Sequence, residues 1–167
     1  MRRALLLLLP VPVLVLGLAG GPAAAAPADA VRIFLAGRVQ DPAIALVATG
    51  AITGVGTLSA TSVDYHPADR TYRETDVAAL GPGTLTLSVD GTFDTWPFDL
   101  DPATCTAHGS LSGKWTITAA TGDFAGSGGG GTFSGRYVTH AAKGPAGCDT
   151  TALQGFVAGS MVGAVRR

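Results

Sequence analysis

The sequence predicts an all-β fold, an antiparallel up-and-down β-barrel of about eight strands. Short stretches of alternating apolar and polar residues recur along the chain, separated by Gly, Pro or Asp. No stretch has apolar residues at the three-and-four spacing of an amphipathic helix. Glycines also recur inside the predicted strands, as strongly coiled barrel strands require. This last feature favours a closed barrel over the alternative, a β-sandwich.

Residues 1–30 have the pattern of a secretory signal peptide. A basic pair at positions 2 and 3 precedes an uncharged apolar run that ends in small residues. Two Ala-x-Ala cleavage sites follow, and because Pro27 disfavours the first, we expect cleavage after Ala30. The alternative, a stable membrane anchor, is disfavoured because the run is short and contains two prolines. The protein is therefore expected to be secreted and extracellular, with residues 31–167 forming one barrel domain.

Cys105 and Cys148 are the only cysteines in the chain. An even number of cysteines in an exported protein predicts a disulfide bond. Closing this loop would stabilise the fold by roughly 4 kcal/mol in the chain-entropy model. The alternatives are a reactive thiol or a metal site, but a metal site would need further Cys or His residues at regular spacing.

In the first half of the domain, residues 31–39 are expected to form a strand that a turn at Asp41-Pro42 ends. Residues 43–60 predict either two strands or one strand bent at a glycine. A polar loop is expected over residues 61–73, and a strand over residues 72–80.

The following stretch predicts two tight hairpins. Residues 84–89 alternate clearly, and Asp90-Gly91 is a strong two-residue turn signal before a return strand over residues 92–98. A second turn is expected at Ser112-Gly113, between strands over residues 105–111 and 114–119.

The C-terminal part begins with a glycine-rich stretch, residues 126–131, before a predicted strand over residues 132–139. A loop is expected over residues 140–150. The last predicted strand, residues 152–165, alternates throughout its length.

The richest polar cluster surrounds Glu74, the only glutamate in the chain. Together with His66 it could serve acid–base chemistry at one mouth of a barrel. A solvated loop with local ion pairs explains the same residues equally well. Glu74 and His66 are therefore the candidate catalytic residues.

Four aromatic residues are candidates for ligand binding: Tyr65, Tyr72, Trp96 and Trp115. The segment 94–101 contains three acidic residues as well as Trp96. The acidic residues could bind calcium, and Trp96 could stack against a sugar. The acidic spacing is not that of a calcium-binding loop, and the end of a strand with its turn is the structural alternative.

Composition and spacing argue against several other classes. A formal net charge of −1 without a basic stripe disfavours nucleic-acid binding. The histidines His66, His108 and His140 lack metal-ligand spacing, so neither a metal nor a cofactor is predicted. No nucleophile motif or phosphate-binding loop is present. The sequence does not predict an oligomeric state.

Residues 113–135 contain the pattern Thr-Gly-x-Phe-x-Gly, which begins at Thr121 and includes Phe124 and Gly126. Gly122 and Gly135 complete the match. This stretch resembles secreted bacterial β-barrels related to the allene oxide cyclase and dirigent proteins. The resemblance implies a barrel whose interior can hold a hydrophobic small molecule. Plant members guide cyclisation or radical coupling with polar side chains inside the barrel, but the resemblance does not identify such residues here.

The expected function is a binding or interaction module for a small apolar ligand or a component of the cell envelope. One alternative is an enzyme of the cyclase or isomerase type with its active site in the barrel lumen, and an enzyme is the less favoured hypothesis. The other alternative is a structural exported barrel without a ligand. The content of the lumen distinguishes these hypotheses.

Overall fold

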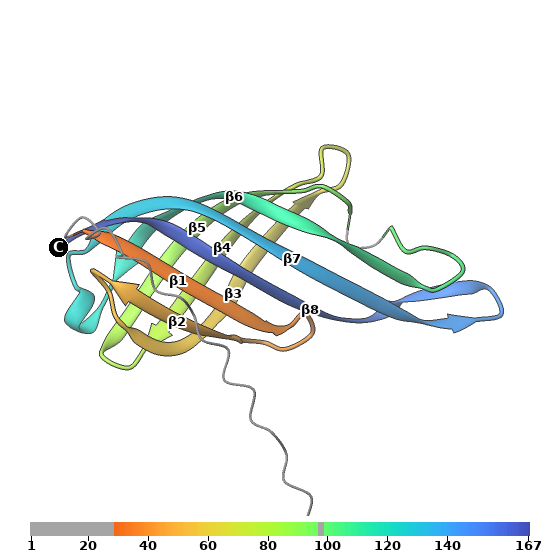
Figure 1. Cartoon of the computed structure of the whole chain (residues 1–167), viewed down its shortest axis with the longest axis horizontal. Coiled ribbons are helices and arrows are strands. Elements are labelled where there is room, and N and C mark those ends of the chain that lie inside the picture. The colour runs from red at the N-terminus through yellow and green to blue at the C-terminus, as the bar shows by residue number, and fades with distance from the viewer. Residues whose placement is uncertain (1–28, 97–98) are drawn as a thin grey trace, which may run out of the picture.

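The structure is a computed structural model that describes residues 29–96 and 99–167. It is a closed antiparallel barrel of eight strands in which each strand pairs with its neighbours in sequence and β8 closes on β1 (Figure 1). The predicted fold class is confirmed. Residues 1–28, most of the predicted signal peptide, lie outside the described residues. The elements are β1 (Ala30–Arg38), β2 (Ile44–Gly50), β3 (Gly54–His66), β4 (Thr71–Leu80), β5 (Gly83–Phe93), β6 (Thr106–Ala120), the 3-10 helix η1 (Gly122–Phe124), β7 (Gly128–Gly144) and β8 (Gly147–Arg166).

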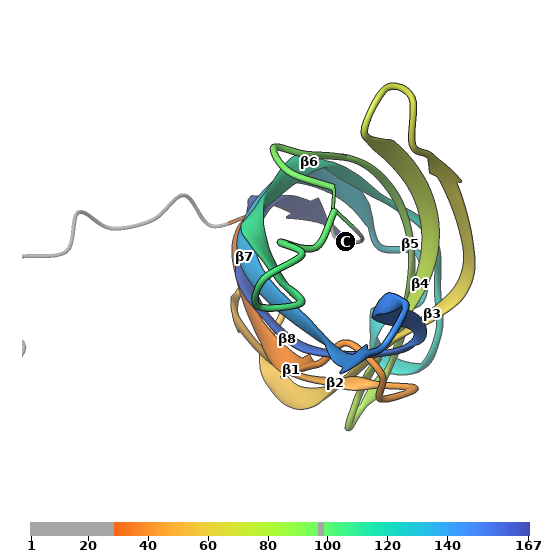
Figure 2. The same cartoon turned by 90° about the vertical axis from the view of Figure 1, so that its right-hand side faces the viewer.

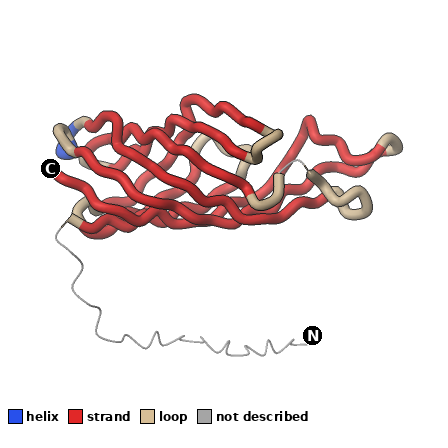
Figure 3. The backbone as a smooth tube through the Cα atoms, turned by 90° about the horizontal axis from the view of Figure 1, so that it is seen from above, coloured by secondary structure: helices blue, strands red, loops and turns tan. Residues whose placement is uncertain are grey.

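The two ends of the barrel differ. We call the end that carries the β2–β3, β4–β5 and β6–β7 connections the closed end, and the other the open end. In Figure 3 the closed end is the one with the short helix and the C-terminus. At the closed end, Ile52 from the β2–β3 connection and Phe124 from η1 are buried against the strands. Alternating inward side chains fill this half of the barrel, as the period of two in the sequence predicts. They include Val31, Ile33, Leu46, Ala48, Leu80, Leu85, Leu87, Trp115, Ile117 and Val165.

The predicted hairpin turn at Asp90-Gly91 is wrong, because β5 runs straight through both residues. Gly91 pairs with Tyr72 on one side and with Gly113 on the other. A Cβ atom at position 91 would collide with the ring of Tyr72. Gly91 therefore provides space for a neighbouring aromatic ring rather than a turn. The expected return strand is wrong as well, since β5 ends at Phe93; residues 97–98 lie outside the described residues.

The predicted turn at Ser112-Gly113 is also wrong. β6 continues from Thr106 to Ala120, so the two expected strands are one long strand. At Gly113 a Cβ atom would collide with the carbonyl oxygen of Asp90 and would lie 2.7 Å from the ring of Phe133. As at Gly91, the glycine lets an inward aromatic ring pass close to the backbone.

The expected loops over residues 61–73 and 140–150 are both hairpins. β3 extends to His66 before β4 begins at Thr71, and β7 extends to Gly144 before β8 begins at Gly147. The β7–β8 hairpin reaches well beyond the barrel at the open end (Figure 1). The tips of these hairpins are largely exposed on both faces. They consequently lack the apolar alternation that marks a half-buried strand in a sequence.

Residues 43–60 form two strands, one of the two predicted arrangements, and the break between β2 and β3 lies at residues 51–53. The final alternating stretch forms β8 as expected, with Val157, Met161 and Val165 facing the interior. Phe156 and Val162, on the opposite face of the strand, are exposed. The strand faces were therefore predicted better than the turns.

Candidate functional site

The open half of the lumen contains a cavity of about 360 Å³. It begins where the packed side chains of the closed half end, and the β1–β2 connection borders it at the mouth. Its wall is mostly apolar. The apolar side chains that line it include Leu35, Ile44, Leu58, Val89, Leu111, Phe133, Leu153, Val157 and Met161.

Two carboxyl groups face this apolar wall. Glu74 and Asp76 lie two residues apart on β4, so both side chains project from the same face of the strand into the lumen. Asp76 is only 5% exposed. The two side chains are hydrogen-bonded to each other. We call these residues the acid pair.

The environment keeps a proton on the acid pair at neutral pH. Burial, with the neighbouring charge of Asp76 and their hydrogen bond, raises the pKa of Glu74 to about 8. Burial raises the pKa of Asp76 to about 6, although the hydrogen bond from Glu74 opposes this shift. The two carboxyl groups therefore share a proton near pH 7. The pair then carries about one negative charge between its two members.

Aromatic rings surround the space between the acid pair and the mouth. The rings of Tyr72 and Phe93 are 4.8 Å apart between centroids, and the ring of Tyr137 meets Phe93 edge-on at 5.7 Å. Trp96 packs edge-on against both Tyr65 and Phe93, at 5.5 Å from each. We call these five residues the aromatic collar. Burial is the main cause that raises the pKa of Tyr65 and of Tyr72, so both phenols stay neutral at physiological pH.

Side-chain hydrogen bonds fix the start of the β5–β6 connection against the collar. Asp94 accepts hydrogen bonds from the backbone N–H and the hydroxyl of Ser110, both at 2.7 Å. Arg70 donates to the carbonyl of Asp94 at 2.7 Å, and the Tyr137 hydroxyl donates to the carbonyl of Thr95. Figure 2, a view onto the open end, shows this connection lying over part of the opening. These bonds thus hold residues 94–96 against the collar.

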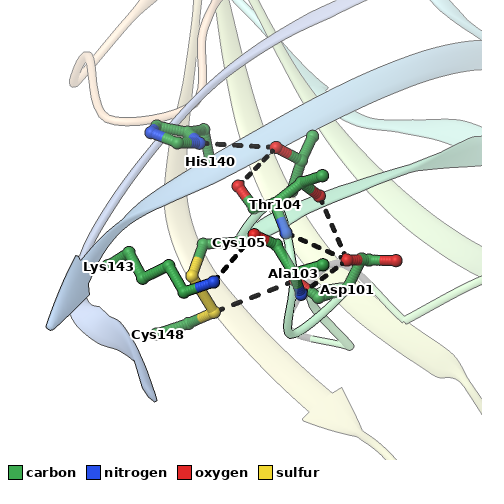
Figure 4. The surroundings of a disulfide bond; sticks show 8 residues. Asp101, Ala103, Thr104, Cys105, His140, Lys143 and Cys148 are labelled. Atoms are coloured by element: carbon green, nitrogen blue, oxygen red, sulfur yellow. Dashed lines mark hydrogen bonds between the residues drawn. A yellow bond between two sulfur atoms is a disulfide. The ribbon is translucent and has the colours of Figure 1, made fainter. Parts of the chain in front are cut away.

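The Cys105–Cys148 disulfide ties the beginning of β6 to the β7–β8 hairpin at the same end (Figure 4). The predicted bond is confirmed. Lys143 donates to the carbonyl of Ala103 at 2.9 Å, and Asp101 accepts hydrogen bonds from the two backbone N–H groups that precede Cys105. The covalent bond and these polar contacts hold the far end of the β5–β6 connection in place.

The structure brings three of the predicted site residues to the cavity: Glu74, Tyr65 and Tyr72. Trp96 lies beside them in the aromatic collar. The other two are elsewhere. His66 lies on the outer side of β3, 47% exposed, where its Nε2 is 3.2 Å from an Asp64 carboxylate oxygen. Trp115 is buried in the closed half and donates a hydrogen bond to the Thr132 carbonyl.

Asp76 and Tyr137 are site residues that were not among the predicted candidates, although Asp76 belongs to the polar cluster around Glu74 that the sequence shows. Asp76 lies on a strand whose inward positions could have been followed by their period of two. On β4 the inward series runs Tyr72, Glu74, Asp76, so two carboxylates on one lumenal face were readable from the sequence. Tyr137 had no such signal, because its role depends on the backbone of Thr95, 42 residues away.

The site can hold an apolar molecule and offer it a proton donor, a carboxylate and neutral phenols. In the described part of the chain, no group of three or more His, Cys, Asp or Glu side chains is arranged to hold a metal ion. Two of the three acids in the segment considered for calcium accept hydrogen bonds from the chain itself. Asp94 binds Ser110, and Asp101 caps the turn before Cys105.

Within residues 29–96 and 99–167, no helix is long and apolar enough to cross a membrane. Comparisons of the chain with protein-family models, with curated proteins and with solved structures found no match.

Proposed function

We propose that this protein is an exported barrel that binds a small, mostly apolar ligand in its lumen. The observation that supports this most directly is the cavity of about 360 Å³ between a packed closed end and a partly covered mouth. A small-molecule site is typically a concave, mainly apolar space with a few placed polar groups. Here the polar groups are the acid pair and the phenols of the collar.

Export is part of the proposal. It is supported by the signal-peptide pattern of residues 1–30 and by the disulfide, which is typical of oxidising compartments. A secreted barrel with a mainly apolar lumen is suited to carrying or capturing a molecule that dissolves poorly in water.

A fluorescence titration tests the lumen as the binding site. N-phenyl-1-naphthylamine is neutral and brightens in apolar surroundings, so we expect a saturable increase with one site per chain. Val157→Trp places an indole in the cavity wall and should weaken binding at least tenfold. Val162→Trp is the matched control on the same strand, since Val162 faces outward and is 40% exposed. Equal binding by wild type and Val157→Trp would place the ligand outside the lumen.

A second experiment identifies the natural ligand class. Native mass spectrometry of protein purified from its own host should show a retained species that Val157→Trp lacks. An empty wild-type barrel that also does not bind the fluorescent probe would favour the third hypothesis, a structural barrel without a ligand.

One observation favours an enzyme as a second candidate function. Burial beside Asp76 raises the pKa of Glu74 inside an apolar cavity, and a raised pKa is typical of carboxyl groups that act as general acids. A cyclase or isomerase would use the proton of this pair on a bound substrate. His66 takes no part in this proposed catalysis, because it lies outside the lumen. Conversion of the ligand found by mass spectrometry, abolished by Glu74→Gln, would establish this candidate.

A further inference from the structure

We propose that the lumen selects ligands that carry one basic nitrogen, a protonated amine on an apolar body, and that the acid pair is the counter-ion. This inference rests on the proposed function, because it assigns the ligand class of the same cavity. Its three supports are the charge buried at the acid pair, the aromatic collar beside it and the apolar wall.

The first support is an unbalanced charge. Near neutral pH the acid pair shares one proton and keeps one negative charge inside the barrel. Among the described residues that line the cavity, only Arg38 is basic, and it lies exposed at the mouth next to the acidic Asp41. No described basic side chain in the lumen is thus paired with the acids. A buried charge without a counter-ion is costly, and a cationic ligand would remove that cost.

The second support is the aromatic collar. Tyr72 precedes Glu74 by two residues on the same lumenal face, and Phe93 stacks beside it at 4.8 Å. Aromatic faces attract ammonium groups, most strongly where water is excluded. An ammonium group bound to the acid pair would therefore lie beside rings that also favour a cation.

The third support is the apolar remainder of the wall, formed by side chains such as Val89, Phe133 and Met161. It provides no charged partner for a second polar group on the ligand. The cavity thus matches a molecule with one cationic end and a hydrocarbon or aromatic body. An anionic ligand such as a fatty acid would place a second negative charge beside the acid pair.

Three probes of equal shape separate charge from size: 2-naphthylmethylamine, 2-naphthalenemethanol and 2-naphthoate. Calorimetric titration at pH 7 should show the amine binding at least tenfold more tightly than the alcohol, and the carboxylate binding most weakly. Equal binding of amine and alcohol would overturn the inference while leaving the lumen as a binding site. If none of the three binds, the proposed function fails together with the inference.

The pH dependence gives an independent readout on the wild-type protein. The amine remains a cation between pH 5 and 7, but both members of the acid pair are protonated at pH 5. The advantage of the amine over the alcohol should therefore fall to less than threefold at pH 5. The other titratable groups facing the pair are Tyr65 and Tyr72, which stay neutral in this range. An advantage unchanged at pH 5 would contradict the role of the pair.

Two variants complete the test. The double variant Glu74→Gln/Asp76→Asn removes both charges with little change of shape, so it should bind the amine and the alcohol equally. The single variant Glu74→Gln keeps the negative charge on Asp76 and should retain most of the preference for the amine. A double variant that still prefers the amine tenfold would refute the assignment of the counter-ion.

Discussion

Glu74 and Asp76 are hydrogen-bonded neighbours on the inward face of β4, and both carboxyl groups have a pKa above the ordinary value. The acid pair distinguishes the chemistry of the open half of the lumen from that of the closed half. Among the described residues, the buried cluster of the closed half is apolar and the Ser127 hydroxyl is buried beside it, whereas the open half contains this acid pair beside a cavity. Since buried carboxyl groups lower stability when they ionise, their position is a cost that a binding function would explain.

The acid pair predicts a stability that falls as pH rises. A carboxyl group whose folded-state pKa is raised stabilises the fold below its unfolded-state pKa and loses that contribution as pH rises through the folded value. For Glu74 this window lies between about 4.5 and about 8. Between pH 5 and 9, the wild type should lose roughly 3 kcal/mol more unfolding free energy than Glu74→Gln.

Urea unfolding at several pH values measures this difference. Asp123→Asn removes an exposed carboxylate at the closed end and is the charge-matched control, which should follow the wild-type curve. Parallel curves for wild type and Glu74→Gln would show that Glu74 ionises as it does in water.

The disulfide predicts a covalent contribution to stability. Cys105 and Cys148 are 43 residues apart in sequence, and their bond closes a loop that contains the β6–β7 hairpin. Replacing both with serine should lower the unfolding free energy by roughly 4 kcal/mol. Urea unfolding of the oxidised wild type, the reduced wild type and the double variant checks this value. Equal stability of all three would show that the bond contributes nothing to the folded state.

Two hydrogen bonds at the start of β1 predict that the position of signal-peptide cleavage affects the stability of the barrel. The carbonyl of Asp29 accepts a hydrogen bond from Val165, and that of Ala30 accepts one from Ala51, both at 2.8 Å. Cleavage after Ala30, as expected from the sequence, would remove both acceptors. Cleavage after Ala26 would retain them.

A chain beginning at Val31 should therefore be less stable by about 2 kcal/mol than one beginning at Pro27. Thermal unfolding of the two chains measures the difference, and the intact mass of the exported protein shows which one occurs naturally. Identical melting temperatures would mean that water replaces both acceptors at no cost.

The buried faces of the strands were predicted correctly from the sequence, whereas the turns at Asp90-Gly91 and Ser112-Gly113 were predicted wrongly. The sequence predicts which side of a strand is buried, because alternation reports contact with the core directly. Leu85, Leu87 and Val89 face inward as their spacing indicates. The glycines at positions 91 and 113 were interpreted as turns because local sequence does not reveal a ring on another strand. The ring of Tyr72 at Gly91, and the carbonyl of Asp90 with the ring of Phe133 at Gly113, occupy the space that a Cβ atom would need.

The candidate site shows the same limit. Glu74, Tyr65 and Tyr72 were recognised because polar and aromatic residues cluster in one segment, and the lumen receives all three. His66 was grouped with them although its position in β3 places it on the opposite face from Tyr65. The contribution of Tyr137 arises only when the barrel closes and brings β7 beside the β5–β6 connection.

The most direct test of a ligand-binding lumen uses Met161. It is 2% exposed, it lines the cavity, and Met1 is the only other methionine in the chain. Labelling the methionine methyl groups with carbon-13 therefore gives one lumenal signal for nuclear magnetic resonance. During titration with N-phenyl-1-naphthylamine, the Met161 methyl signal should shift in proportion to the fluorescence increase and show Overhauser contacts to the naphthyl protons. A saturating fluorescence change that leaves the Met161 signal unmoved would contradict a ligand-binding lumen.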